Sequence, residues 1–425
     1  MSSSREPTPS QVDVPAGSPQ SVLRQPRRGQ YPAVPPAEFA DRPIRVAIVY
    51  AVLYRFRMPI FRRLSSDDGL RVKILVGQGV PGTKFSNAPD ASGVDAEILW
   101  TLQKQVVSTG RSVTMMFNPT LPFRLWRFRP DVLLIQGGML PNNWLTWAYS
   151  KLTGTPVVWW SLGEVRERKF NGLSGKYRKW VRAVEKTSDA FAGYSSPAVD
   201  YFLSQGYPED RCFNLVNVVD TDLVAEQMHA TQDQVPALRK QLGLEGQQVI
   251  LFVGSLIETK GIDTLLRAFA RLDSAADSAK LLIVGDGPER ENAERLAVEL
   301  EITERVIFVG AVYEGVSTYF QLGDLLVLPG TGGLAISEGM AHGLPVICSI
   351  GDGVELDLID DGENGFCVPP KDVDVLAEKI AHSLESPERL QEMGEHSLKI
   401  IRERANIDRY LNEMRAAIFR ALERR

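Results

Sequence analysis

The chain has 425 residues, of which 44% are hydrophobic and 24% are charged, and its formal net charge is −5. This length suits two globular domains, and no apolar run reaches the roughly 18 residues of a membrane-spanning helix or resembles a signal peptide. The three cysteines show no CxxC spacing, which argues against a disulfide framework or a zinc site and favours a reducing cytoplasm.

Residues 1–43 are rich in Ser, Pro, Gln and Arg and hold few large apolar residues, so we expect a disordered tail. After it, apolar runs alternate with segments of helical periodicity, which predicts a parallel, doubly wound sheet over residues 44–222. The expected strands cover 44–52, 71–77, 129–138, 155–161 and 189–195. The expected helices cover 57–64, 142–154 and 174–187, and Gly154 closes the second of them.

The pattern restarts beyond the NVVDTDLV segment at 217–224. We therefore expect a second domain over residues 223–404, and an α/β fold of two Rossmann-like, doubly wound parallel-sheet domains that face a cleft. Its expected strands cover 248–256, 280–288, 305–312, 324–330 and 345–350, and its clearest amphipathic helix covers 261–272. Residues 405–425 predict one closing amphipathic helix.

The two halves differ in charge. Residues 1–222 hold 28 Lys and Arg against 19 Asp and Glu, a net charge of +9, and the remainder holds 20 against 34, a net charge of −14. The basic half mixes Arg and Lys with aromatic residues in RFRMPIFRR, PFRLWRFRP and RERKFNGLSGKYRKW. Such a surface suits a membrane with anionic lipids or a soluble anionic sugar, and a solvated basic helix face has the same pattern.

In open parallel sheets, ligands bind beyond the C-terminal ends of the strands. In the second half, VGSLIETKG places Gly254 and Ser255 at such an end and Lys260 just before a helix. A small residue lets the backbone approach an anion, and Lys supplies a point charge. The VGDGP turn that contains Gly285 is a weaker signal, because an ordinary tight turn explains it at least as well.

The stretch PGTGGLAISEGMAHGLPVI, at 329–347, is the strongest candidate site. Gly332 and Gly333 precede a helix that should begin near Leu334, and the free N–H groups at such a start bind anions with the help of the helix dipole. Glu338 lies about one turn further on, where a carboxylate can accept two hydrogen bonds from a ribose diol. Alternatively, Glu338 is an acid that complements the helix dipole.

Two DxD matches, at 220–222 and 372–374, are possible ligands for a metal that holds a nucleotide diphosphate. The first lies at the domain junction and the second precedes an apolar helix, where Asp is an ordinary N-cap, so we expect no metal site. The four histidines are scattered and none is paired with a Ser or Cys, so none is assigned to catalysis. We expect His342 to pack under the HGLPVI turn.

The second half resembles the retaining family-4 glycosyltransferases of GT-B fold. Motifs in family order and spacing carry the resemblance from about 217 to 372: NVVD, VGSLIETKGIDTLLRAF, LIVGDGPERENAERL, RVIFVGAV, GDLLVLPG, GGLAISEGMAHGLPVI and DDGENGFCVPPKD. The first half is compatible through YRFRMPIF and RPDVLLIQ. The resemblance implies that a UDP- or GDP-linked sugar binds mainly to the second domain and an acceptor to the first, and that the closing helix returns to the first domain.

The resemblance also implies the roles of single residues. Lys260 contacts the diphosphate, the Gly332–Leu334 backbone cradles it, and Glu338 holds the ribose, so Lys260 and Glu338 are the candidate catalytic residues. The candidate donor-binding residues are Gly254, Ser255, Lys260, Gly285, Gly310, Gly332, Gly333, Leu334 and Glu338. Neither a metal nor a cofactor is implied beside the donor.

Three positions depart from the family pattern. The family has a Glu, seven residues and a second Glu, but counting back from Glu338 leads to Gly330, so the carboxylate that looks at the donor sugar in relatives is absent. An Arg that is common after the strand-end glycine is Ser255 here. Many members have a His after an N-terminal strand, where this chain has 162–164, and Glu164 is the candidate contact from that segment.

A branch of the family with PG…GL in place of the first Glu carries a Glu-x-acid pair downstream. Glu355 and Asp357 match that pair and are candidate contacts of the sugar or the acceptor. On this interpretation Gly330 is a variant and not a lesion.

We therefore expect a metal-independent, retaining glycosyltransferase of cell-surface polysaccharide or glycolipid synthesis, in the cytoplasm or at the inner face of the cell membrane. The alternatives are a non-catalytic nucleotide-sugar binder, which Gly330 and Ser255 favour, and a nucleotide-sugar epimerase, for which the chain offers no convincing acid and base set. A nucleic acid partner is not expected, because the sequence pI is about 5.6 and no recognition motif is present.

Overall fold

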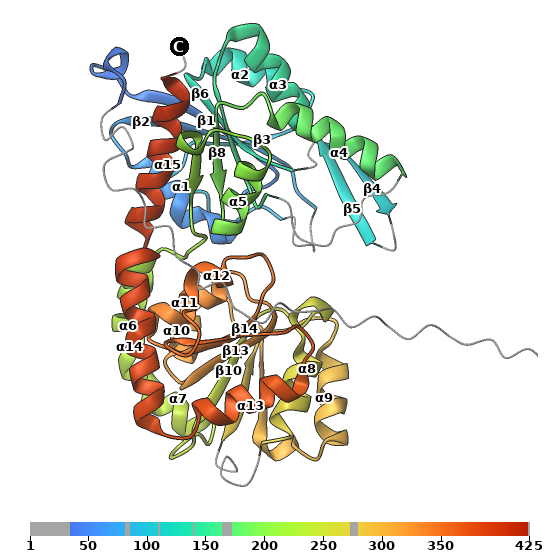
Figure 1. Cartoon of the computed structure of the whole chain (residues 1–425), viewed down its shortest axis with the longest axis vertical. Helices are drawn as coiled ribbons and strands as arrows, with labels where there is room; N and C mark the ends of the chain where they lie inside the picture. The colour runs from blue at the N-terminus through green and yellow to red at the C-terminus, as the bar shows by residue number, and fades with distance from the viewer. Residues whose placement is uncertain are drawn as a thin grey trace, which may run out of the picture.

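The computed structural model describes residues 35–80, 86–108, 111–138, 141–163, 172–272 and 279–423. Two parallel β-sheets, each covered by helices on both faces, form two domains that lie one above the other in Figure 1. This confirms the expected α/β class with two Rossmann-like domains. None of the helices that the structure describes combines the length and apolar character needed to cross a lipid bilayer.

The N-terminal sheet has seven parallel strands in the order β3-β2-β1-β6-β7-β8-β9. Its strands are β1 Ile44–Tyr50, β2 Leu70–Gly77, β3 Ala96–Leu99, β6 Val132–Gln136, β7 Val157–Ser161, β8 Ala190–Gly193 and β9 Cys212–Asn214. The central strands β6 and β7 are apolar and buried up to their last residues, Gln136 and Ser161, as expected for parallel strands between two helical layers.

The helices of this domain are α1 Met58–Ser65, α2 Leu121–Phe128, α3 Asn142–Thr153, α4 Gly172–Glu185 and α5 Ser196–Ser204, with short 3₁₀ turns η1 Ala37–Phe39, η2 Arg55–Arg57 and η3 Glu209–Arg211. Helix α3 ends at Gly154, whose φ of 73° is left-handed, as the sequence predicts. One face of the sheet packs against α2 to α5 and the other against α1 and the last helix of the chain.

The C-terminal sheet has six parallel strands in the order β12-β11-β10-β13-β14-β15, the Rossmann order. Its strands are β10 Val249–Val253, β11 Lys280–Val284, β12 Val306–Gly310, β13 Leu325–Thr331, β14 Val346–Ser349 and β15 Gly365–Val368. The chain reverses its direction of winding between β10 and β13, and in such sheets ligands bind beyond the strand ends at this switch point.

The second domain is covered by α6 Thr221–Thr231, α7 Val235–Gln241, α8 Ile262–Phe269, α9 Arg290–Glu299, α10 Val316–Phe320, α11 Leu334–Ala341, α12 Glu355–Leu358, α13 Val373–Ser383 and α14 Pro387–Arg404. Its 3₁₀ turns are η4 Gln232–Gln234, η5 Glu258–Lys260 and η7 Thr303–Arg305. Helix α6 begins at Thr221, so the expected boundary at 222/223 falls just inside a helix that Asp220 caps through the N–H of Leu223.

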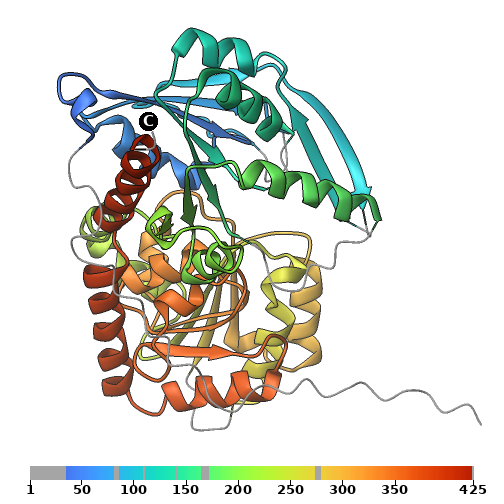
Figure 2. The same ribbon diagram turned by 45° about the horizontal axis from the view of Figure 1, so that its top comes forward.

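The last helix, α15 Ile407–Leu422, leaves the second domain and packs along β8 and β9 of the first (Figures 1 and 2). Its apolar face supplies Tyr410, Met414 and Ile418 to the core beneath the N-terminal sheet. The expected tail ends earlier than 43 among the described residues, because Phe39 is buried against the first domain and Arg42 pairs with Asp131 at 2.7 Å.

A two-stranded antiparallel hairpin, β4 Leu102–Ser108 and β5 Arg111–Phe117, stands apart from both sheets (Figure 1). The sequence did not predict it, since LQKQVVS carries too few apolar residues to show a buried strand. The short strands β3, β9 and β15 were also not predicted, because three or four residues give no period to detect.

Candidate active site

The loops after the strands of both sheets meet at the domain junction. A β-carbon placed on Gly353, after β14, would lie 3.1 Å from the ring of Pro197, which follows β8. The guanidinium of Arg55, after β1, lies 5.8 Å from the ring centre of Tyr313, which follows β12. Both domains therefore present the end at which open parallel sheets bind ligands to the same place.

The sequence PGTGG forms the end of β13 and the entry to α11. Gly333 occupies the N-cap position with a φ of 65°, and no side chain caps the helix. A β-carbon at Gly332 would lie 2.4 Å from the side chain of Ile336, so a larger residue fits there only if that side chain moves. The N–H of Ile336 donates to the Gly333 carbonyl at 3.3 Å, and the start of α11 has the uncapped geometry from which the sequence predicts an anion site at Leu334.

Lys260 lies at the end of η5 and reaches across to this same turn. Its ammonium donates hydrogen bonds to the carbonyl oxygens of Thr331 and of Gly332, the latter at 3.4 Å. Burial lowers the pKa of Lys260, and the attraction of Asp352 and Glu355 opposes that effect. The structure thus brings together the cation and the helix start that the sequence assigned to one diphosphate.

Glu338 lies one turn into α11 on its accessible side. Burial raises the pKa of its carboxyl group to about 7, and among the described residues no group is recorded as a hydrogen-bond partner of that carboxyl. Four residues later, His342 stacks on Phe320 with ring centres 4.9 Å apart, and its Nε2 lies 2.8 Å from the Ser317 hydroxyl. Burial lowers the pKa of His342 to about 4, so this histidine is a packing residue, as expected.

Gly254, Gly285 and Gly310 lie side by side across the ends of β10, β11 and β12. The N–H of Gly285 donates to the carbonyl of Gly310 at 2.8 Å. A β-carbon at Gly285 would lie 1.8 Å from the carbonyl oxygen of Gly254, so the packing of the loops alone requires glycine at position 285. Ser255, the next residue after Gly254, has an exposed side chain.

Gly330 is enclosed by the backbone of η5. A β-carbon at this position would lie 2.3 Å from the carbonyl oxygen of Thr259 and 2.6 Å from the carbonyl carbon of Lys260. These distances are far below van der Waals contact, and the atoms are backbone atoms that cannot swing aside. With this backbone, a side chain at position 330 fits only if η5 shifts, so the carboxylate that the family pattern has there is sterically excluded from this conformation.

The two downstream acids differ in their surroundings. Glu355 is completely buried, and its Oε2 accepts the N–H of Gly353 at 2.9 Å. Asp357 is 2% exposed and accepts hydrogen bonds from the backbone N–H of Ser196, at 2.7 Å, and from the Ser196 hydroxyl. Asp357 therefore caps helix α5 of the other domain, which is a different task from the sugar contact that the sequence suggested. Glu164 lies outside the described residues.

The two DxD matches have structural roles. Asp372 is the N-cap of α13 and accepts the N–H of Val375, as predicted. Asp220 caps α6 and pairs with Arg63, which also pairs with Asp222 at 2.8 Å. In the part of the chain that the structure describes, no three His, Cys, Asp or Glu side chains are grouped as metal ligands.

Sequence reasoning missed Arg57, a buried arginine at the junction. Its guanidinium lies 4.8 Å from the ring centre of Tyr194 and 5.0 Å from that of Trp160, and it donates to the Asn217 side chain at 2.9 Å. It is 3% exposed, and its Nε has no hydrogen-bond partner among the described residues. No local pattern could have revealed this, because four separate segments build the enclosure.

Sequence reasoning also missed Asp352, the half-buried acid of the SIGDGVEL segment. One of its oxygens accepts the N–H of Val354 at 3.2 Å. Burial raises the pKa of its carboxyl group, against the attraction of Lys260 and Arg57. An acid between two glycines at a strand end was the signal available in the sequence.

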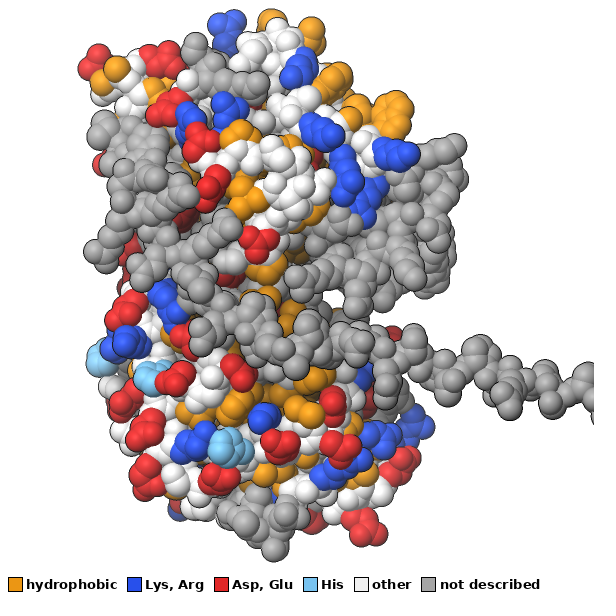
Figure 3. All heavy atoms as spheres, in the orientation of Figure 1, with side chains coloured by type: hydrophobic (Ala, Val, Ile, Leu, Met, Phe, Trp, Pro, Cys, Tyr) orange, Lys and Arg blue, Asp and Glu red, His pale blue; other side chains and the backbone are white. Residues whose placement is uncertain are grey.

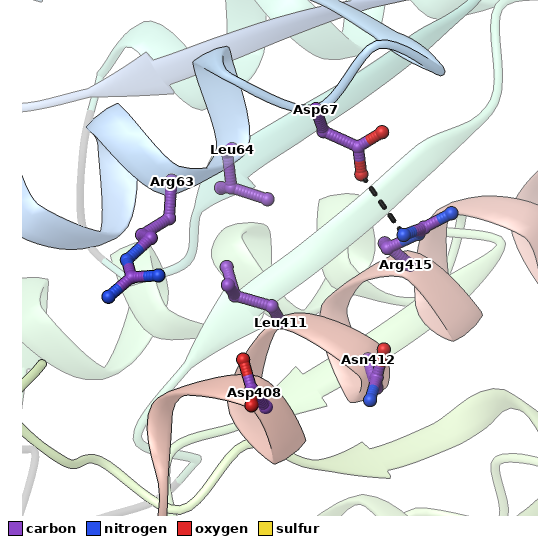
Figure 4. A pocket seen from close by; sticks show the side chains of 7 residues that line it. All are labelled: Arg63, Leu64, Asp67, Asp408, Leu411, Asn412 and Arg415. Atoms are coloured by element: carbon purple, nitrogen blue, oxygen red, sulfur yellow. Dashed lines mark ion pairs between the residues drawn. The ribbon is translucent and has the colours of Figure 1, made fainter. Parts of the chain in front are cut away.

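Figure 4 shows a separate pocket of about 260 Å³ between α1 and α15. Polar side chains line its edges, where Arg415 pairs with Asp67 at 3.3 Å. Leu64 and Leu411 face each other in its middle. None of its lining residues belongs to a strand-end loop of the C-terminal sheet, so this pocket is not part of the candidate site.

Residues 234–399 match the family model of the glycosyl transferases group 1. Over this segment, the chain is similar to that family. The segment spans the whole C-terminal sheet, with the Lys260 turn and helix α11, so the candidate site lies within it or at its border with the first domain.

Two relatives illustrate the range of group 1 proteins to which the chain is similar. It is 30% identical over 171 residues to alpha-D-kanosaminyltransferase of Streptomyces kanamyceticus, a match that covers 39% of this chain and 44% of the relative. It is 28% identical over 228 residues to a GDP-mannose-dependent phosphatidylinositol monomannoside mannosyltransferase of Mycolicibacterium smegmatis, covering 51% and 58%. The chain thus spans about half the length of the curated relatives it matches.

The fold is shared over a longer stretch. The crystal structure of Anabaena HepE in complex with UDP superposes with a TM-score of 0.70 at 16% identity and covers 88% of this chain and 99% of the other. This likeness shows that the two-domain fold is shared, including the N-terminal domain that lies outside the segment matched by the family model.

Proposed function

We propose that the protein transfers a sugar from a nucleotide-sugar donor to an acceptor held by its N-terminal domain. The observation that carries this proposal is the convergence of the Lys260 ammonium with the uncapped start of α11, one turn before the free carboxylate of Glu338. A cation and helix N–H groups suit a diphosphate, and a carboxylate suits a ribose diol. The group 1 family match and the glycosyltransferase relatives support the same activity.

In the proposed reaction, the bond between the anomeric carbon and the donor phosphate oxygen breaks, and a bond from that carbon to the acceptor oxygen forms. Negative charge grows on the leaving diphosphate, where Lys260 and the α11 N–H groups stabilise it. The leaving phosphate oxygen accepts the proton of the acceptor hydroxyl, so no dedicated base is needed. We propose retention at the anomeric carbon, as in the family-4 resemblance, with no metal and no cofactor.

The donor is proposed to be a UDP- or GDP-linked sugar. UDP is bound in the HepE structure, and the mycobacterial relative is named for GDP-mannose. The proposed acceptor is a glycan or a lipid-linked sugar of the cell surface.

We propose that the protein acts at the inner, cytoplasmic face of the cell membrane. The helices α2 and α4 expose large aromatic side chains: Phe123 is 63% exposed, Trp126 62% and Trp180 61%. Exposed cations lie among them, namely Arg127, Lys151 and Lys179. Figure 3 shows basic and apolar side chains side by side over α3 and α4. Aromatic residues mixed with cations favour the interface of an anionic bilayer.

A thermal-shift panel of UDP-, GDP- and ADP-sugars tests the donor first, because a bound donor stabilises the folded state before any acceptor is known. Stabilisation by one nucleotide class, followed by release of its diphosphate when an acceptor extract is added, is the expected result. A donor that binds but is never consumed would instead identify a non-catalytic nucleotide-sugar binder, the second candidate that Gly330 and Ser255 favour. A panel without any shift would reject both.

A further inference from the structure

The sugar end of the donor site lacks its expected carboxylate at position 330, and in this conformation the structure closes that position to any side chain. A group that holds the hydroxyls of the donor sugar must therefore come from another segment. The loop from Ser349 to Val354, after β14, lies directly against the turn that contains Gly330. A β-carbon on its Gly351 would lie 3.0 Å from the α-carbon of Thr331, the residue after Gly330.

Glu355 holds this loop in place through a hydrogen bond to its backbone. The side chain of Glu355 is completely buried, one of its oxygens accepts the N–H of Gly353, and the other has no hydrogen-bond partner among the described residues. That second oxygen would lie 3.1 Å from a β-carbon on Gly351. Glu355 therefore shapes the backbone of the loop and does not itself face the junction.

Asp352 lies at the tip of the same loop and is only half-buried. Its Oδ1 accepts the N–H of Val354, and its Oδ2 has no hydrogen bond to a described residue. The loop that carries Asp352 contacts both domains: a β-carbon on Gly351 would lie 3.0 Å from the α-carbon of Thr331, and one on Gly353 would lie 3.1 Å from the ring of Pro197 in the N-terminal domain. The attraction of Lys260 and Arg57 lowers the pKa of the Asp352 carboxyl, against the larger effect of burial.

We infer that the Asp352 carboxylate accepts hydrogen bonds from the hydroxyls of the donor sugar. It would replace the acid that the family pattern has at position 330. This inference rests on the proposed function. Asp352 stands between Gly351, which lies against Thr331 of the turn that Lys260 contacts, and Gly353, which lies against Pro197 of the first domain, so it lies beside the proposed diphosphate site at the junction. A carboxylate there accepts hydrogen bonds from two neighbouring hydroxyls of a hexose.

The same carboxylate has the opposite effect on a donor without its sugar. A free nucleoside diphosphate carries an extra negative charge at its terminal phosphate, where Asp352 repels it. Asp352 therefore favours the nucleotide sugar over the nucleoside diphosphate product. It is a specificity-determining residue that separates substrate from product, and its removal should move the two affinities in different directions.

The test measures four dissociation constants by calorimetry, for UDP, UDP-glucose, GDP and GDP-mannose, on the full chain. In Asp352→Asn, we expect the sugar nucleotide that the wild type binds to lose about 10- to 100-fold in affinity. The matching nucleoside diphosphate should bind equally well or more tightly. Asp352→Ser, which also keeps an acceptor for the Val354 N–H, should give the same split if the first variant fails to fold.

The exposed acid Asp233 serves as the matched control, because Asp233→Asn removes one negative charge from the same domain away from the loop. It should leave all four constants unchanged. A variant of Asp352 that weakens sugar nucleotide and nucleoside diphosphate equally, or changes neither, overturns the inference. A wild type that binds none of the four compounds rejects the proposed function itself, which is a different result.

Discussion

The carboxylate of Asp357 binds both the backbone N–H and the hydroxyl of Ser196, and so joins α12 of one domain to the start of α5 in the other. Asp357 is buried and Ser196 is half-buried, and Asn214 lies beside the contact, 2.9 Å from the Ser196 hydroxyl. It fixes the loop with Asp352 against the first domain, so it sets the spacing of the two halves of the candidate site.

Asp357→Ala should therefore lower the free energy of unfolding by about 1–3 kcal/mol, because it removes the carboxylate acceptor of two hydrogen bonds from Ser196. Chemical denaturation followed by intrinsic fluorescence measures this loss. Ser204→Ala, which removes an exposed hydroxyl at the other end of α5, is the control and should be neutral. A double-mutant cycle of Asp357 and Ser196 that gives no coupling would show that the contact does not join the domains.

Lys260→Ala should reduce sugar transfer about 30- to 1000-fold, or about 2–4 kcal/mol, because one charge on the leaving diphosphate is lost in the transition state. Steady-state assays with the donor found in the thermal-shift panel measure the loss. Lys240→Ala removes an exposed lysine on α7 and should keep full activity. Wild-type rates in the Lys260 variant would remove this residue from the mechanism.

Glu338 should make stability depend on pH. Its folded pKa of about 7 lies above its ordinary value of 4.5, so the folded state holds the proton more tightly than the unfolded state. Its contribution is fully present below pH 4.5 and is lost as pH rises through 7. Glu338→Gln, which mimics the protonated form, should be about 1–2 kcal/mol more stable than the wild type at pH 8 and equal to it near pH 4.

Thermal unfolding of both proteins from pH 4 to pH 8 checks the Glu338 prediction. The exposed acid Glu245, changed to Gln, should run parallel to the wild type at every pH. If the Glu338 variant also runs parallel, its carboxyl is not held in a protonated state.

Gly330→Ala should destabilise the protein by about 1–3 kcal/mol or more, since the new methyl group meets the Thr259 carbonyl oxygen at 2.3 Å. Gly330→Glu should be worse and should not gain transfer activity. Gly69→Ala is a fair control, because a β-carbon there meets only a side-chain oxygen of Asp67 at 3.2 Å. A stable Gly330→Glu variant with faster transfer would mean that the site has decayed and can be repaired.

Binding to the membrane should depend on the exposed aromatic residues. Replacing Phe123 and Trp126 with Ser should lower co-sedimentation with anionic liposomes at least tenfold, because roughly 1.5–3 kcal/mol of apolar transfer is lost per side chain. Val298→Ser changes an exposed apolar residue of the second domain and should have no effect. Wild-type protein that stays in the supernatant with both neutral and anionic vesicles contradicts the membrane proposal.

Most of the longer helices and strands could be predicted because apolar residues recur in them with a regular spacing or in an unbroken run. Apolar runs identified β1, β10 and β13, and Gly154 marked the end of α3. The hairpin β4–β5 escaped because only three of the seven residues in β4, LQKQVVS, are apolar, which gives no continuous apolar run.

The candidate site was predictable only as far as its parts are close in sequence. Gly332, Gly333 and Glu338 belong to one turn and one helix, and the structure places them as the pattern indicates. The contact of Asp357 with Ser196 joins residues 161 positions apart, and no local pattern records such a pair. The same holds for Gly330, because the backbone that leaves no room for a side chain there belongs to a segment about 70 residues earlier.

The last helix has a consequence for the order of synthesis. Ile407, where α15 begins, follows the end of β9 by 193 residues, yet α15 covers one face of the sheet to which β9 belongs. At about 5–20 residues per second, a ribosome needs roughly 10 to 40 s to supply that cover. During this time the nascent N-terminal sheet holds an open apolar face, so it depends on chaperones or on the tunnel exit until the second domain has been made.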